Sequence, residues 1–241
     1  MIDVVFWSLA AYLIGSVPTA YLVGRLTKGI DIRQYGSGNV GGANTVATIG
    51  LRAGIIVAVI DIAKGAVVVG LARWLGQSAA VLAFSTVAVT AGHNWSIFLR
   101  FTGGRGMGAA FGASLFLDPL PLAVVSVPGF LLIGLAKILR WPILAEITLV
   151  FALAFPAAAW LLDSPATIVA GEVAMVGVLI AKRLLSNAGM LRSSEPMHRL
   201  LLYRLLFDRD IASYEEWVYR HPAETLNQPA VPDGGRASGH Q

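Results

Sequence analysis

The sequence predicts an all-α integral membrane protein, a seven-transmembrane-helix bundle whose inner-side loops are rich in glycine. Of the 241 residues, 56% are hydrophobic and only 13% are charged, whereas a soluble domain carries about 25% charged residues. A fold of this size cannot bury so much apolar surface, so lipid must cover it. The charges also concentrate between long apolar stretches, as they do in the loops of a membrane bundle.

Seven apolar stretches define the predicted helices, and six of them are long enough to cross a bilayer. About 20 residues of α-helix span a hydrocarbon core of roughly 30 Å. The stretch at residues 106–117 has only twelve residues, so it borrows flanking residues, lies beside a thinned or water-filled region, or re-enters without crossing. In chain order the stretches are residues 4–23, 53–72, 74–99, 106–117, 119–136, 141–162 and 164–181.

The loop charges predict how the bundle is oriented. With the N-terminus outside, the inner loops hold almost all the basic residues, and the outer loops hold three acidic residues and Arg73. This is the positive-inside pattern. A re-entrant fourth stretch would place Lys137 and Arg140 outside, so we expect all seven stretches to cross. The first stretch is not a cleaved signal peptide, because no basic segment precedes it.

The composition changes abruptly after residue 181. We expect a polytopic membrane domain over residues 1–186, a cytoplasmic amphipathic extension over 187–220 and a disordered tail over 221–241. The segment 196–207 either places its leucines in the membrane interface or packs on the inner face of the protein. The sequence shows no internal repeat, which disfavours an inverted-repeat transporter.

The inner-side segment at residues 30–50 is rich in glycine and in polar side chains, and it predicts a loop rather than a helix. Its glycines permit positive φ, so consecutive N–H groups can form an anion-binding nest. The side chains of Ser37, Asn39 and Asn44 would add hydrogen-bond donors. An ordinary turn has a similar composition, so the segment alone permits either interpretation.

The segment at residues 92–108 contains Arg105 within a Gly-Gly-Arg-Gly turn that leads into the fourth helix. The fixed charge and the helix N-terminus both favour an anion. An arginine that only sets topology would explain the charge but not the three surrounding glycines. His93 is either a neutral core residue or part of the site.

Acidic residues also fall within the predicted spans. Asp61 and Lys64 lie three residues apart and share one helix face, which predicts an ion pair directed into the bundle. Glu146 and Glu172 are more ambiguous, because with Asp61 they could instead form a proton or cation path.

Several classes of chemistry are not indicated. The sequence has no cysteine, which excludes disulfides and thiol catalysis. It has no Walker phosphate loop, paired-histidine metal motif or Gly-x-Ser-x-Gly elbow, so we expect neither a cofactor nor a metal. The basic residues do not cluster on a soluble domain, which disfavours nucleic-acid binding.

A series of short motifs runs in fixed order through residues 4–187. They are Gly15-Ser16-Val17-Pro18, Gly29-Ile30-Asp31-Ile32-Arg33, Gly36-Ser37-Gly38-Asn39 with Asn44 and Gly50, Asp61-Ile62-Ala63-Lys64-Gly65, Gly92-His93, Phe98-Leu99-x-Phe101 and Gly103-Gly104-Arg105-Gly106. In order and spacing they resemble the bacterial acyl-phosphate-dependent glycerol-3-phosphate acyltransferases, the PlsY family.

The resemblance implies an enzyme of the bacterial cell inner membrane that acts in phospholipid synthesis. It would transfer a fatty acyl chain from acyl phosphate to glycerol 3-phosphate, giving lysophosphatidic acid and phosphate. Such a site must mainly hold two phosphates and align a hydroxyl. The implied catalytic residues are Ser37, Arg105 and Asn187. The implied substrate-binding residues are Gly36, Gly38, Asn39, Asn44, His93, Gly103 and Gly104.

The chain departs from the family pattern at several positions. The family's loop arginine is replaced by Ala47, its glycine-loop lysine by Arg105, and the histidine of its last helix by Leu184. These changes motivate a second hypothesis, a non-catalytic paralogue that binds acyl phosphate or phospholipid. A third, a transporter using Asp61, Glu146 and Glu172, would leave the glycine loops without a role.

Overall fold

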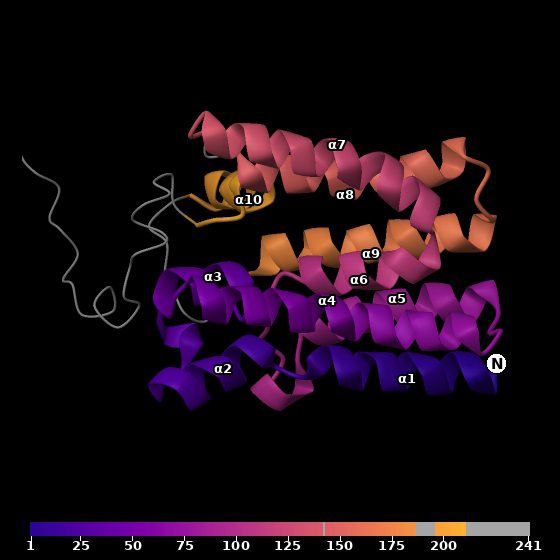
Figure 1. Cartoon of the computed structure of the whole chain (residues 1–241), viewed down its shortest axis with the longest axis horizontal. Coiled ribbons are helices and arrows are strands. Elements are labelled where there is room, and N and C mark those ends of the chain that lie inside the picture. Colours follow the sequence, from indigo (N-terminus) through magenta and orange to yellow (C-terminus); the bar gives the residue numbers. More distant parts are fainter. Residues whose placement is uncertain (142, 187–195, 211–241) are drawn as a thin grey trace, which may run out of the picture.

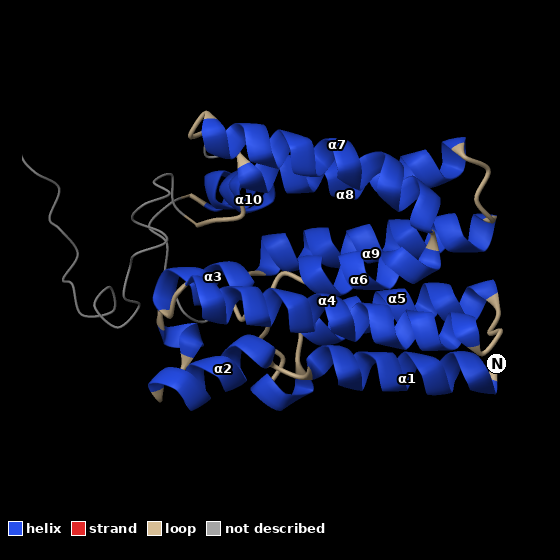
Figure 2. Ribbon diagram, in the orientation of Figure 1, coloured by secondary structure: helices blue, strands red, loops and turns tan. Residues whose placement is uncertain are grey.

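The computed structural model describes residues 1–141, 143–186 and 196–210, and these ranges form helices joined by loops. The long helices lie side by side with roughly parallel axes, and the chain reverses direction from one to the next (Figures 1 and 2). They are α1 (Ile2–Ser16), α4 (Leu51–Trp74), α5 (Ala79–Asn94), α6 (Met107–Leu117), α7 (Pro119–Ile138), α8 (Leu144–Leu161) and α9 (Ala166–Leu185).

The described ranges contain ten α-helices rather than the seven that the sequence predicted. Each predicted apolar stretch overlaps one of the seven helices given above. The additional ones have 7 to 11 residues and lie at the end of the bundle opposite the N-terminus (Figure 1). They are α2 (Thr19–Lys28), α3 (Gly42–Thr48) and α10 (Met197–Phe207).

The first predicted span, residues 4–23, is not one continuous helix. α1 ends at Ser16 and α2 begins at Thr19, with Pro18 between them. Proline has no N–H to donate and its ring clashes with the preceding turn. The carbonyl of Val17 instead accepts from the backbone N–H of Thr19 at 3.0 Å and from the Lys64 ammonium. The break thus exposes a carbonyl to the bundle interior.

The prediction that residues 30–50 form a loop without helix was also wrong. Ile32–Gln34 forms a 3-10 turn (η1) and Gly42–Thr48 forms α3. A seven-residue helix of this composition is marginal alone, but α3 packs directly on α4. A Cβ at Gly54 of α4 would lie 2.2 Å from the Cγ2 of Val46, so close packing stabilises a helix that local propensity does not predict.

The exterior of the bundle is apolar. Large side chains such as Phe6, Val59, Phe130 and Val150 are each more than half exposed. Four segments of the described chain are long and apolar enough to cross a membrane: Ile2–Lys28, Leu51–Trp74, Pro119–Ile138 and Leu144–Leu161. Lipid is the solvent that such a surface requires, so the chain is a multi-pass membrane protein.

Glycines allow close contacts between α1 and α5 and between α4 and α6. A Cβ at Gly15 of α1 would lie 2.1 Å from the Val89 carbonyl oxygen of α5. A Cβ at Gly112 of α6 would lie 1.9 Å from the carbonyl oxygen of Ile62 in α4. Small residues at interfaces are typical of membrane helices, whose association depends on packing rather than on exclusion of water. These close contacts therefore pack α1, α4, α5 and α6 together, and we call these four helices the frame of the bundle.

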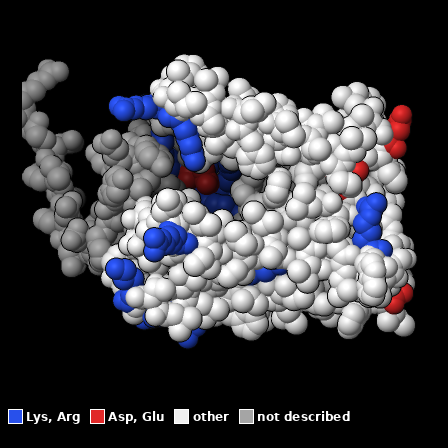
Figure 3. All heavy atoms as spheres, in the orientation of Figure 1, with Lys and Arg blue, Asp and Glu red and all other residues white. Residues whose placement is uncertain are grey.

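On the face shown in Figure 3, most Lys and Arg side chains lie toward one end of the bundle, and the other end carries acidic side chains and one basic group. Acidic atoms also lie among the basic ones in a hollow near the basic end. The basic end holds α2 and α3. α10, which follows within the predicted extension, packs against α8 and α9. The predicted tail at residues 221–241 lies outside the described residues.

Candidate functional site

The two glycine-rich segments meet at the basic end of the bundle. The backbone N–H of Val40 donates to the carbonyl of Gly103 at 3.5 Å. Arg33 Nη1 donates to the Thr102 hydroxyl at 3.4 Å. Segments more than 60 residues apart in sequence therefore form one surface, as a single anion site requires.

Asn44 organises the first segment from inside. Its side-chain amide donates to the carbonyls of Ile32, Tyr35 and Asn39 at 3.0 to 3.1 Å. Its side-chain oxygen accepts from the backbone N–H of Ser37 at 3.1 Å. Asn44 is 5% exposed. The residue expected to bind substrate thus uses its polar atoms to shape the loop.

Ser37 lies between two glycines that have left-handed backbone conformations. Gly36 has φ 53° and Gly38 has φ 68°, values that glycine adopts without steric cost. The Ser37 hydroxyl is half-buried and accepts from the backbone N–H of Asn39 at 3.4 Å. The buried Asn39 side-chain oxygen has no hydrogen-bond partner among the described residues. The positive φ of the two glycines agrees with the expectation from the sequence, but the backbone N–H groups of Ser37, Gly38 and Asn39 donate within the loop. An anion-binding nest at this turn therefore stays a prediction.

Gly103 and Gly104 lie directly against His93. The N–H of Gly104 donates to the His93 carbonyl at 3.1 Å. A Cβ at Gly104 would lie 2.2 Å from His93 Nε2 and 2.5 Å from the Val40 carbonyl oxygen. Glycine is needed here because any side chain would separate the two segments. Close approach is sufficient to require glycine at this position, and the expected role of Gly103 and Gly104 in substrate binding stays a prediction.

Arg105 belongs to a group of charged side chains that we call the loop cluster: Arg105, Lys182, Arg183 and Asp208. Arg105 Nη1 donates to the Lys182 carbonyl at 2.9 Å, and Arg105 Nε lies 2.9 Å from Asp208 Oδ1. Burial raises the pKa of Asp208, and the Arg105 charge opposes that rise. Figure 3 shows a hollow on this face in which acidic atoms are surrounded by Lys and Arg atoms.

The other two cations of the loop cluster come from the last turn of α9. Lys182 is 1% exposed, and its ammonium lies 5.5 Å from the centre of the Trp95 ring. Arg183 is 6% exposed and donates to the Ala145 carbonyl and the Thr148 hydroxyl of α8. Buried cations beside an arginine are costly, and an anionic ligand would lower that cost.

A second group, the helix cluster, comprises Asp61, Lys64 and His93. Lys64 Nζ lies 2.8 Å from Asp61 Oδ1, which confirms the predicted ion pair. His93 Nδ1 lies 3.7 Å from the same oxygen. All three side chains are less than 10% exposed. Because Lys64 also bonds the Val17 carbonyl, the cluster ties the helix break to the second glycine segment.

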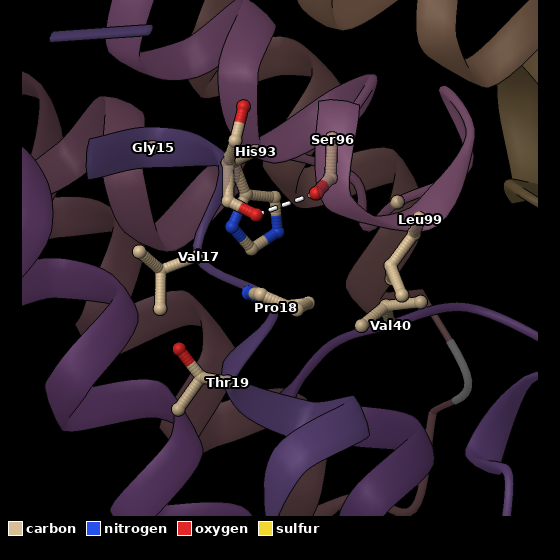
Figure 4. Close-up of a pocket in the computed structure, with 10 residues that line it drawn as sticks. Gly15, Val17, Pro18, Thr19, Val40, His93, Ser96 and Leu99 are labelled. Carbon is tan, nitrogen blue, oxygen red and sulfur yellow. Dashed lines mark hydrogen bonds between the residues drawn. The ribbon is translucent and has the colours of Figure 1, made fainter. Parts of the chain in front are cut away.

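A narrow recess adjoins the helix cluster, where the α1–α2 break faces α5 and the loops (Figure 4). The Ser96 hydroxyl points to the main chain of α1 and donates to the Ser16 carbonyl. Val17, Thr19, Val40 and Leu99 complete the walls. Burying the break in this way satisfies carbonyls that the helices leave unpaired.

Other residues singled out from the sequence lie apart from these clusters or outside the description. Asn187 lies outside the described residues. Ala47 is exposed on α3, and Leu184 is half-buried with its carbonyl accepting from Arg204. Glu172 is fully buried in α9, and neither carboxylate oxygen has a hydrogen-bond partner among the described residues. Glu146 lies in the first turn of α8.

Asp208 was not predicted as part of the site. The sequence offers only a weak signal for it, an acidic pair that follows a basic amphipathic segment. Its contact with Arg105 depends on the chain returning to the bundle after α10, and local pattern does not encode that path.

Comparisons with known proteins agree with this architecture. A family model described as Glycerol-3-phosphate acyltransferase matches residues 5–194. Glycerol-3-phosphate acyltransferase 4 of Dehalococcoides mccartyi is 34% identical over 215 residues, covering 89% of this chain and 92% of that protein. The Thermus thermophilus glycerol-3-phosphate acyltransferase is 44% identical over 139 residues, covering 58% of this chain and 67% of its own length.

Two solved structures share the fold. Crystal structures of PlsY (YgiH), an integral membrane glycerol 3-phosphate acyltransferase, match with 23% sequence identity. The glycerol 3-phosphate form has a TM-score of 0.69, covering 93% of this chain and 99% of that chain. The lysophosphatidic acid form has a TM-score of 0.66, covering 83% and 93%.

Proposed function

The chain belongs to the glycerol-3-phosphate acyltransferase family, and from that premise we propose that it transfers an acyl chain from acyl phosphate to glycerol 3-phosphate, giving lysophosphatidic acid. The observation that carries the proposal is the joining of the two glycine-rich segments beside Arg105. An arginine held between fixed loops at the end of a membrane bundle can contact a phosphate while the acyl chain stays in lipid.

The reaction needs positioning more than a covalent intermediate. Acyl phosphate is a mixed anhydride with a good leaving group. The acceptor hydroxyl oxygen bonds to the acyl carbon, the bond from that carbon to the phosphate oxygen breaks, and the hydroxyl proton passes to phosphate. Fixed donors that hold the phosphates and align the hydroxyl supply the main acceleration. We assign phosphate contact to Arg105, with Ser37 and Asn39 on the same surface and Asn187 following α9.

Formation of lysophosphatidic acid by the purified full-length protein tests the proposal. Labelled glycerol 3-phosphate is supplied with palmitoyl phosphate in one reaction and palmitoyl-CoA in a matched one. We expect lysophosphatidic acid in the reaction with palmitoyl phosphate and none in the reaction with palmitoyl-CoA. Product with the CoA donor alone would overturn the donor assignment, and product with neither would overturn the enzymatic one.

We further propose that seven helices cross the inner membrane, with the N-terminus outside and the glycine segments and the extension at residues 187–220 in the cytoplasm. The separation of basic and acidic ends supports this orientation. Because the chain has no cysteine, single cysteines at the exposed Gln34 and Asp163 report it directly. An impermeant thiol reagent should label them from opposite sides, and same-side labelling would refute it.

The second candidate is a non-catalytic paralogue that binds acyl phosphate or phospholipid. The observation that favours it is that Arg105 is already engaged by Asp208 and by a main-chain carbonyl. Normal binding of a phosphate ligand without turnover by any acyl phosphate and acceptor pair would establish this function in place of the first.

A further inference from the structure

The residue paired with Arg105 lies beyond the residues that the family model matches. The family model ends at residue 194, whereas Asp208 follows α10. We propose that Asp208 is an internal competitor for the anion site: its carboxylate occupies Arg105 when substrate is absent and leaves when a phosphate binds. This inference rests on the proposed role of Arg105 and adds a residue that sets the apparent affinity for phosphate.

The contact resembles the one that a phosphate would make, but its geometry is poor. Arg105 Nε lies 2.9 Å from Asp208 Oδ1, and Arg105 Nη2 donates to the Asp208 carbonyl at 3.4 Å. The Nε–Oδ1 contact is too bent to count as a hydrogen bond for either atom. A phosphate, with more oxygens and more charge, can align two N–H groups of the guanidinium at once. The carboxylate is therefore the weaker ligand.

The backbone directs Asp208 toward the cluster. Its φ of 55° and ψ of 33° place it in the left-handed region, where it ends α10 and turns the chain. Aspartate tolerates this conformation better than most residues. The side chain is 22% exposed, although its Oδ1 is buried against Arg105, so part of the Asp208 side chain already lies at the surface.

α10 is attached by contacts that do not involve Asp208. Arg204 pairs with Asp210 at 2.6 Å and donates to the Leu184 carbonyl at 2.9 Å. Arg183 donates to the Leu205 carbonyl at 3.1 Å. Rotation of the Asp208 side chain would thus release Arg105 Nε from the carboxylate without undocking α10, while the main-chain contacts of the guanidinium could stay in place. A local change of this kind suits a contact that is exchanged in each binding event.

Binding of inorganic phosphate and of glycerol 3-phosphate, measured by calorimetry on the full-length protein, tests the proposal. The Asp208→Asn variant removes the competing charge and keeps the side-chain shape. If the carboxylate occupies Arg105 in about nine molecules of ten, its removal should lower the apparent Kd about tenfold. The Asp208→Glu variant keeps the charge and should stay near wild type. Thermal unfolding checks that each variant is folded, and Asp208→Ser replaces Asn if it is not.

The matched control is Asp210→Asn, two residues away in the same segment but paired with Arg204. It should leave the Kd within about twofold of wild type. An unchanged or weaker affinity in Asp208→Asn, an equal gain in Asp210→Asn, or no phosphate binding by any variant would overturn the proposal. Failure of the proposed function looks different: phosphate binding would respond to Asp208→Asn while no lysophosphatidic acid is formed.

Discussion

The helix cluster and the loop cluster both bury charge, but they differ in where the compensating charge comes from. Asp61 and Lys64 lie on the same helix, 2.8 Å apart, and His93 joins them from the neighbouring helix α5. Arg105 is met instead by a main-chain carbonyl of α9 and by Asp208, which follows α10. In the helix cluster, the compensating charge comes from helices within the bundle. In the loop cluster, it comes from Asp208, in the segment that follows α10.

This difference separates structural from exchangeable charge. The buried Asp61–Lys64 pair has its compensating charge within one helix, so an outside anion that replaced the carboxylate would have to enter the bundle. A carboxylate at a turn beyond the bundle can be replaced by a better anion. We therefore assign the helix cluster to holding the frame and the loop cluster to binding substrate, and the predictions below test that division.

The largest expected effect is on folding, from Asp61→Ala. Removing one partner of a buried pair leaves Lys64 uncompensated, which typically costs about 3–5 kcal/mol. Thermal unfolding in detergent should show a large loss of Tm, or the protein should fail to accumulate. The double variant Asp61→Ala/Lys64→Met should recover part of the loss. A single variant as stable as wild type would contradict the structural role.

Arg105→Ala should affect activity rather than folding. Loss of a charge-assisted contact to a desolvated phosphate costs about 2–3 kcal/mol, or roughly 30- to 150-fold in kcat/KM. Thermal stability should change much less. The exposed arginines Arg52 and Arg100 provide matched controls, because their alanine variants lose the same charge near the same loops. Equal losses in all three variants would point to a general surface potential instead.

Much of the fold follows from the sequence because lipid imposes simple rules. Length, apolarity and loop charge located the seven long helices and the basic end. The same rules fail at Pro18 and at α3. By hydropathy, residues 4–23 form one apolar stretch, but Pro18 lacks an N–H and interrupts the helix there. α3 exists because Val46 packs on Gly54, a tertiary contact that composition does not reveal.

The site was predictable in its residue types and less so in its roles. Arg105 and the glycines that surround it were identified from local pattern. Asn44 was expected to bind substrate, but its amide holds three carbonyls of its own loop. Gly104 was expected at a ligand, and close packing on His93 is sufficient to require glycine there. Such roles depend on which neighbours the fold supplies, and spacing along the chain does not specify them.

Gly104→Ala should weaken the joint between the two glycine segments. The added Cβ must displace the His93 ring and the Val40 main chain. The ring can turn but the Val40 carbonyl belongs to the backbone, so we expect a cost of about 1–3 kcal/mol, the usual overpacking range. Tm and activity should fall together. Gly177→Ala is the control, since a Cβ there meets nothing within 4 Å. Equal behaviour of the two variants would argue against the packing role.

The smallest effect concerns Asp31 and Arg33, a charge pair of the loops outside both clusters. Arg33 donates to both carboxylate oxygens of Asp31, at 2.9 and 2.6 Å. These hydrogen bonds hold the pKa of Asp31 below its ordinary value. A lowered pKa means that the folded state favours the ionised carboxylate. The resulting stability is present above the unfolded pKa, about 3.9, and is lost as the pH falls through the folded pKa.

Asp208 should show the opposite sign, because burial raises its pKa. Its ionised form is disfavoured in the folded state, so the associated stability is present below its unfolded pKa and is lost as the pH rises through the folded pKa. Unfolding curves from pH 3 to 7 for wild type, Asp31→Asn and Asp208→Asn separate the two. The advantage of wild type over Asp31→Asn should be about 1 kcal/mol at neutral pH and vanish below about pH 3. Relative to Asp208→Asn, wild type should lose stability as the pH rises. If both differences had the same sign, Asp208 would be an ordinary stabilising partner of Arg105, and the distinction between fixed and exchangeable charge would fail.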